Sequence, residues 1–157
     1  MIVEELDRAG LPDWERDVDL AGVEVAQREE HNWQDNGEWK SEIRETTSTP
    51  LQVDLVNQQN HIAIEYVSAE DFLDLGGIRS GSTVQGYDMQ EIAQHVSAAV
   101  DQQGDNVYFG ALYDPVVNYE WTSSWETARA ISIEEAKALL REQVRDFVEW
   151  LEGQGAL

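Results

Sequence analysis

The sequence predicts a single α+β domain in which a mostly antiparallel sheet is packed by two main helices, over residues 88–103 and 133–152. Three patterns carry this prediction: runs of alternating apolar and polar residues, longer segments with apolar residues at helical spacing, and a long polar β-hairpin over residues 28–45. A chain of 157 residues has the size of one domain, so we expect residues 1–157 to share one core. The 41% of hydrophobic residues and the six tryptophans exclude intrinsic disorder.

A short helix and a strand are predicted first. Residues 2–9 suit a helix that ends at Gly10 and Pro12, a combination typical of helix C-termini. A strand that runs on into Glu29 follows, because apolar residues recur among polar ones at Leu20, Val23 and Val25.

A hairpin is predicted over residues 51–66, since two alternating runs flank the polar stretch 57–60. The apolar positions of these runs are Leu51, Val53, Leu55, Ile62, Ile64 and Tyr66. We expect this hairpin to be half-buried against the core.

Capping residues mark the next two helices. Ser68 is typical of the cap of a short helix over residues 69–75, which Gly76 ends. Asp88 begins a longer helix that ends before Gly104. The apolar residues of this longer helix recur at helical spacing: Met89, Ile92, Ala93, Val96 and Val100.

The last third of the chain predicts two strands and the final helix. Residues 107–113 form an almost continuous apolar run, which favours a central strand covered on both faces, and residues 117–121 alternate as in a further strand. Ser132 and Glu135 form a capping box at the start of the final helix. Its expected apolar stripe is Ile133, Ala136, Leu140, Val144, Phe147 and Leu151.

The hairpin over residues 28–45 has Asn36-Gly37 at its centre, the strongest short-range signal for a two-residue turn. Such a turn fixes which residues face one another: Arg28 and Glu45, Glu29 and Arg44, His31 and Glu42, Trp33 and Lys40. The first two pairs join opposite charges, and the last allows a cation–π contact.

Neither face of this hairpin is apolar enough to belong to a core. At about 3.3 Å per residue, roughly eight residues per strand make an arm roughly 26 Å long. Isolated two-stranded ribbons are only marginally stable in water, so the hairpin either lies over the domain or projects and docks on a neighbouring subunit. For docking, the candidate protein-interaction residues are Trp33, Trp39, Lys40 and Ile43.

The charge is large and one-sided: 32 acidic residues face 10 basic ones, and the net charge is −22. Only Lys40 and Lys137 are lysines, and the other basic residues are arginines. In molar salt the Debye length is about 3 Å, which screens this repulsion, and carboxylates keep the surface hydrated. The composition therefore favours adaptation to high salt. It also disfavours direct binding to nucleic acid or to an anionic membrane.

No motif for catalysis or for a cofactor is present. The absence of cysteine excludes disulfides, thiolate metal sites and cysteine nucleophiles. His31, His61 and His95 lack a second ligand at metal spacing, and the acidic stretches 17–19 and 101–105 do not match a calcium loop. We therefore expect no catalytic residue, no cofactor and no metal ion.

These observations favour a non-enzymatic structural or interaction protein, adapted to high salt and working as a subunit of a larger assembly. A virion neck or tail of a halophile virus is one setting. The expected partner is another protein or a second copy, bound through residues 28–45, and not nucleic acid or a membrane. The acidic N-terminus and the absence of a long apolar run predict a place in a high-salt cytoplasm or in a virion.

An alternative is a nucleic-acid mimic, whose carboxylates imitate phosphates and block a basic nucleic-acid-binding enzyme. Mimicry accounts for the excess of acid. It gives no reason for the preference of arginine over lysine.

Overall fold

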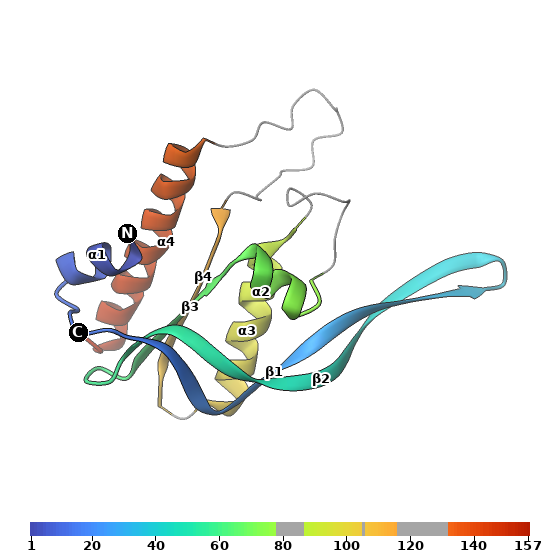
Figure 1. Ribbon diagram of the computed structural model, residues 1–157, viewed down its shortest axis with the longest axis horizontal. Coiled ribbons are helices and arrows are strands. Elements are labelled where there is room, and N and C mark those ends of the chain that lie inside the picture. Colours follow the sequence, from blue (N-terminus) through green and yellow to red (C-terminus); the bar gives the residue numbers. More distant parts are fainter. Residues whose placement is uncertain (78–86, 105, 116–131) are drawn as a thin grey trace.

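The computed structural model describes residues 1–77, 87–104, 106–115 and 132–157, and it confirms the predicted α+β class. A four-stranded mixed sheet, in the order β1-β2-β3-β4, lies among the helices (Figure 1). Its strands are β1 (Glu15–Asp35), β2 (Glu38–Asn57), β3 (Ile62–Val67) and β4 (Tyr108–Tyr113). The helices are α1 (Ile2–Arg8), α2 (Ala69–Asp74), α3 (Met89–Gln103) and α4 (Ile133–Gln154).

Each face of the sheet carries its own apolar core. On one face α2 and α3 cover the strands, and the cluster contains Val53, Phe72 and Ile92. On the other face α1 and α4 do so, around Ile64 and Leu151. The sheet is therefore the middle layer of three, because neither of its faces is left to solvent in the body of the protein.

Strand β3 corrects the expectation of a half-buried hairpin. It pairs with β2 in the predicted antiparallel sense, with Leu55 opposite Ile64. However, Ile62, Ala63 and Ile64 are all 0% exposed, although alternate residues of a strand point to opposite faces. The prediction was wrong because helices pack on both faces of this strand.

Strand β4 was expected at the centre of the sheet, and among the described strands it lies at the edge, parallel to β3. Parallel neighbours need a crossover, which here contains α2 and α3. Coverage of both faces is confirmed, since Phe109 packs against the α3 core and Leu112 against the α4 core. An apolar run thus indicates covered faces and does not indicate a central position. The strand expected over residues 117–121 lies outside the described residues.

The predicted helix boundaries agree with the structure. Capping boxes begin α2, at Ser68 and Asp71, and α4, at Ser132 and Glu135. The predicted apolar face of α3 is buried in full. Ile133, expected in the stripe of α4, is instead 74% exposed, because the first turn of α4 extends past the described end of β4 (Figure 1). The buried residues of α4 are Leu140, Val144, Phe147 and Leu151.

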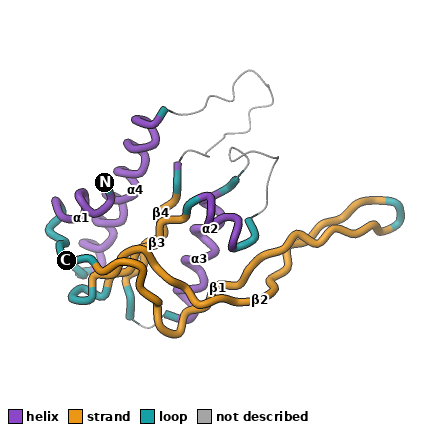
Figure 2. The backbone as a smooth tube through the Cα atoms, in the orientation of Figure 1, coloured by secondary structure: helices purple, strands orange, loops and turns teal. Residues whose placement is uncertain are grey.

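Strands β1 and β2 are much longer than the others and form one hairpin (Figure 2). Its proximal half belongs to the sheet, and its distal half extends away from the body. The distal half comprises residues 28–45, which we call the arm.

Candidate functional site

The arm has the turn and the register that the sequence predicts. Asn36 and Gly37 have φ angles of 51° and 85°. Positive values at both central residues are those of a type I′ turn, whose twist matches that of the flanking strands. All the predicted facing pairs are present: Arg28 with Glu45, Glu29 with Arg44, His31 with Glu42 and Trp33 with Lys40.

Contacts with α2 and α3 fix the base of the arm to the body. The backbone N–H of Arg28 donates to the carbonyl of Leu75 at 3.0 Å, and its guanidinium pairs with Glu91 at 2.5 Å. Gly76 passes so close that a Cβ atom there would lie 1.7 Å from the carbonyl oxygen of Arg28. The arm therefore leaves the body from a defined point.

Side chains of α3 also bind the outer edge of β1 at residues that precede Arg28. The side chain of Gln103 accepts from the N–H of Glu24 at 3.1 Å and donates to its carbonyl at 2.8 Å. The ring of His95 lies 2.7 Å from the carbonyl of Ala26. The other residues of the arm make side-chain hydrogen bonds and ion pairs only with one another, as far as the described residues show.

The predicted interaction residues lie on the two faces of the arm. Trp39 is 76% exposed and Ile43 is 41% exposed. They share one face, because they are four residues apart on a strand whose side chains alternate. Their cross-strand neighbours are Gln34 and Glu30. Trp33 belongs to the opposite face, so the structure brings Trp39 and Ile43 together and leaves Trp33 apart.

Lys40 faces Trp33 in the ladder, but its ammonium group binds the carboxylate of Asp35. Trp33 stacks on His31, with 5.8 Å between the ring centroids. The expected cation–π pairing thus gives way to an ion pair, since a full negative charge attracts an ammonium more strongly than the face of an indole does.

A pair of carboxylates that the sequence analysis missed, the buried Glu65 and the half-buried Asp54, lies where β2 and β3 separate. The backbone pairing of the two strands covers Leu55–Asn57 and Ile62–Ile64. Just beyond it, the carboxylate of Asp54 accepts the N–H of Tyr66 at 2.6 Å, and the Asp54 N–H donates to the carboxylate of Glu65. At this point, where β2 and β3 separate, hydrogen bonds from carboxylate side chains to the backbone take the place of backbone hydrogen bonds between the strands.

Burial raises the pKa of Glu65 to about 8, and the charges of Asp54 and Asp71 raise it further in the same direction. Burial also raises the pKa of Asp54. Glu65 is 7% exposed, and its Oε2 atom has no hydrogen-bond partner in the structure. The Glu65 carboxyl group is therefore mainly protonated at neutral pH. The sequence did contain a signal, because a glutamate stands inside the otherwise apolar run of β3.

The described residues show no group of three or more His, Asp or Glu side chains placed to hold a metal ion. None of the described helices is long and apolar enough to cross a membrane. No protein family, curated protein or solved structure matches the chain. The functional interpretation therefore rests on the geometry of the arm.

Proposed function

We propose that the protein is a non-enzymatic, acidic interaction protein, adapted to high salt, that serves as a subunit of a larger assembly and docks through its arm. The observation that carries the proposal is the contrast within the arm. Its base is held by Arg28, Leu75 and Glu91, whereas every residue of its second strand, from position 38 to position 45, is exposed.

The anchors for docking are Trp39 and Ile43 on one face of the arm and Trp33 on the other. A ribbon of two strands without an apolar cover is marginally stable alone, and a partner surface supplies that cover. Tryptophan is enriched among the residues that dominate binding energy at interfaces. The partner is a second copy or another protein, and the setting is a high-salt cytoplasm or a virion, with a neck or tail as one case.

The test measures molecular mass against protein concentration by light scattering in about 2 M KCl, where the Debye length is near 3 Å or less. The variant carries Trp33→Ala and Trp39→Ala. We expect its association to weaken at least about tenfold, equivalent to roughly 1.4 kcal/mol, because buried aromatic anchors are lost. Trp150→Ala is the matched control, since Trp150 is 43% exposed but lies on α4. An unchanged mass in the arm variant contradicts association of copies of this chain through the arm.

The same titration in 0.1 M KCl separates the proposal from mimicry of nucleic acid. Docking through tryptophan anchors persists or strengthens as KCl rises, because it depends on apolar burial. A mimic instead binds a basic nucleic-acid-binding protein in low salt and loses that affinity steeply as salt is added.

A further inference from the structure

The outer edge of β4 differs from that of β1. The N–H of Tyr108 donates to the carbonyl of His61 at 2.8 Å, and the N–H of Asp114 donates to that of Val67 at 3.1 Å. In this parallel ladder the even-numbered residues of β4 bond to β3. The N–H and C=O groups of Phe109, Ala111 and Tyr113 therefore point away from the sheet.

One of these outward residues is already paired. The side chain of Gln143, on α4, accepts from the N–H of Tyr113 at 3.0 Å and donates to its carbonyl at 3.0 Å. Within the described part of the chain, no hydrogen bond reaches the outward groups of Phe109 and Ala111. Such a row of unpaired groups is a template for another strand.

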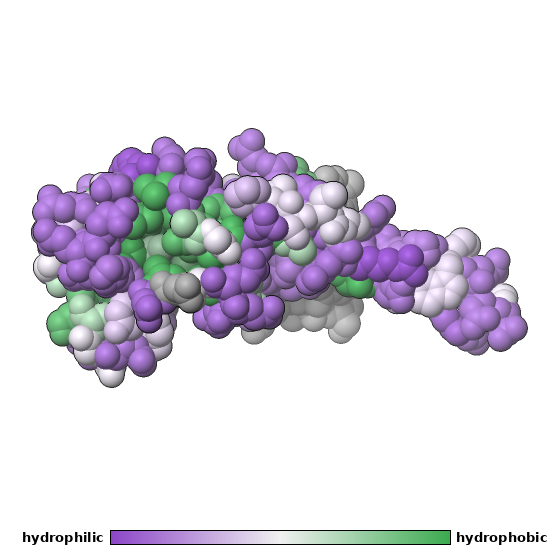
Figure 3. Space-filling model, turned by 90° about the horizontal axis from the view of Figure 1, so that it is seen from below, coloured by the Kyte–Doolittle hydropathy of each residue, from purple (hydrophilic) through white to green (hydrophobic). Residues whose placement is uncertain are grey.

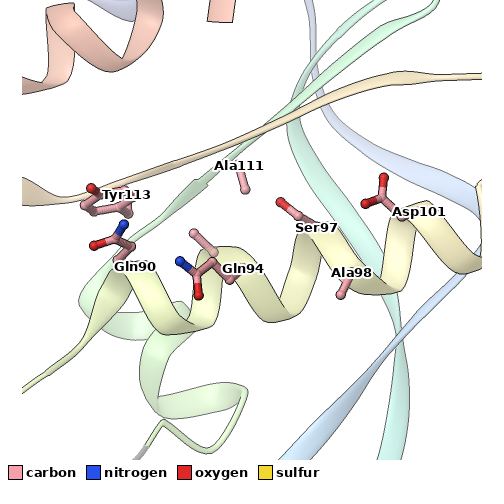
Figure 4. Close-up of a pocket in the computed structure, with 8 residues that line it drawn as sticks. Gln90, Gln94, Ser97, Ala98, Asp101, Ala111 and Tyr113 are labelled. Carbon is pink, nitrogen blue, oxygen red and sulfur yellow. The ribbon is translucent and has the colours of Figure 1, made fainter. Parts of the chain in front are cut away.

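A groove of about 280 Å³ runs beside this open edge, between α3 and β4 (Figure 4). In Figure 4, Ser97 and Asp101 extend from α3 on the side that faces β4, and Ala98 points away from it. Other polar residues that line the groove include Gln90 and Gln94. The groove thus has room for the side chains on one face of an added strand.

The charge of the groove selects the kind of strand. Among the described residues that line the groove, Asp101 is the only charged one. No lysine or arginine occurs in the sequence from Ser80 to Ala128, and the whole chain carries −22. An acidic segment is repelled here, and a basic segment is attracted.

We propose that the open edge of β4 binds an extended, basic segment of a partner protein as an added strand. Backbone hydrogen bonds to Phe109 and Ala111 supply affinity, as in other cases of strand addition. Alternate side chains of the segment enter the groove, where a lysine or arginine reaches the carboxylate of Asp101. This site is separate from the arm and does not depend on how the arm functions.

The test uses the full chain and a synthetic peptide of alternating lysine and valine, roughly eight residues long, which is the length of an ordinary strand. Amide hydrogen exchange, followed by NMR, reports on individual backbone groups. We expect the peptide to slow exchange of the Phe109 and Ala111 amides at least about tenfold, because new strand hydrogen bonds protect them. A peptide N-methylated along its backbone should give no such protection.

Asp101→Lys should weaken binding of the peptide at least about fivefold, because it turns attraction into repulsion. Glu142→Lys is the matched control, since it makes the same change at an exposed position of α4. The proposal is overturned if the two variants bind alike, or if the peptide binds without protecting Phe109 and Ala111. Protection that appears without peptide and grows with protein concentration also overturns it, because the edge then pairs with a second copy.

Discussion

The two halves of the β1–β2 hairpin share one backbone pairing and have opposite surroundings. In the proximal half Leu51, Val53 and Leu55 are between 0% and 6% exposed. In the distal half, β2 is exposed at every residue from 38 to 45. In the view of Figure 3, green apolar surface is visible on parts of the body, whereas the surface of the arm is mainly polar. Backbone hydrogen bonds are therefore compatible with either environment, and the side chains decide which half joins the core.

This difference implies an uneven distribution of stability. The proximal half is held by two apolar cores, one on each face of the sheet. The arm has only cross-strand pairs and the contacts at its base. Segments with few buried contacts open at low free-energy cost, and binding surfaces are often drawn from them.

The largest expected effect comes from truncating one side chain in each half of β2. Leu55→Ala should lower the free energy of unfolding by about 2–5 kcal/mol, because it leaves a cavity under α4. Trp39→Ala should change it by less than about 0.5 kcal/mol, since this side chain is exposed. Guanidinium unfolding of both variants, followed by circular dichroism, measures the difference. Equal losses would show that the arm packs on the body and would remove the contrast.

Local signals in the sequence were sufficient for the helices and for the arm. The helix caps, the apolar face of α3 and the register of the arm depend on residues close in the chain, and the structure confirms them. The Asn36-Gly37 turn fixed the register because its φ angles permit one pairing of the flanking strands.

The position of each element in the sheet could not be predicted in the same way. The edge position of β4 and the burial of both faces of β3 depend on where α3 and α4 pack, which no local pattern specifies. The bonds between Gln103 and Glu24, and between Gln143 and Tyr113, join distant residues through ordinary glutamines. The hydrogen bond between Asp54 and Tyr66 likewise forms because β2 and β3 separate there, and the spacing of the two residues in the sequence does not indicate it.

The second prediction concerns Glu65, in the proximal region where β2 and β3 separate. Glu65 has a pKa of about 8 in the folded protein and an ordinary value of 4.5. The folded state therefore binds the proton more tightly, so this group's stabilising contribution is complete below about pH 4.5 and is lost as the pH rises through about 8. Asp54, whose pKa is also raised, contributes with the same sign at lower pH.

Glu65→Gln should remove most of this dependence, because the amide resembles the protonated acid and cannot ionise. The wild-type protein should lose on the order of a few kcal/mol relative to this variant between pH 5 and about pH 8. Denaturant midpoints at several pH values and constant KCl measure it. Glu70→Gln, at a nearby exposed position of α2, should leave the dependence unchanged. Parallel pH profiles for the wild type and Glu65→Gln would contradict the assignment.

The smallest expected effect compares one ion pair at the base of the arm with one inside it. The side chain of Arg28 is 13% exposed in its pair with Glu91, whereas Arg44 is 54% exposed in its pair with Glu42. Glu91→Gln should cost about 1–2 kcal/mol, because it leaves a largely buried cation without its counter-charge. Glu42→Gln should cost less than about 0.5 kcal/mol, since water and salt screen exposed pairs.

Glu91 also lies in the first turn of α3, where a carboxylate interacts favourably with the helix dipole. Glu134→Gln isolates that contribution, because Glu134 occupies the first turn of α4 and its partner Lys137 is exposed. The free energies of unfolding of Glu91→Gln, Glu42→Gln and Glu134→Gln, measured in low and in molar KCl, then separate the helix-dipole contribution of Glu91 from that of its ion pair with Arg28. A loss at Glu91 no larger than that at Glu134 would show that the pair with Arg28 does not hold the arm. A loss that remains larger in molar KCl supports a fixed base, because salt screens buried pairs far less than exposed ones.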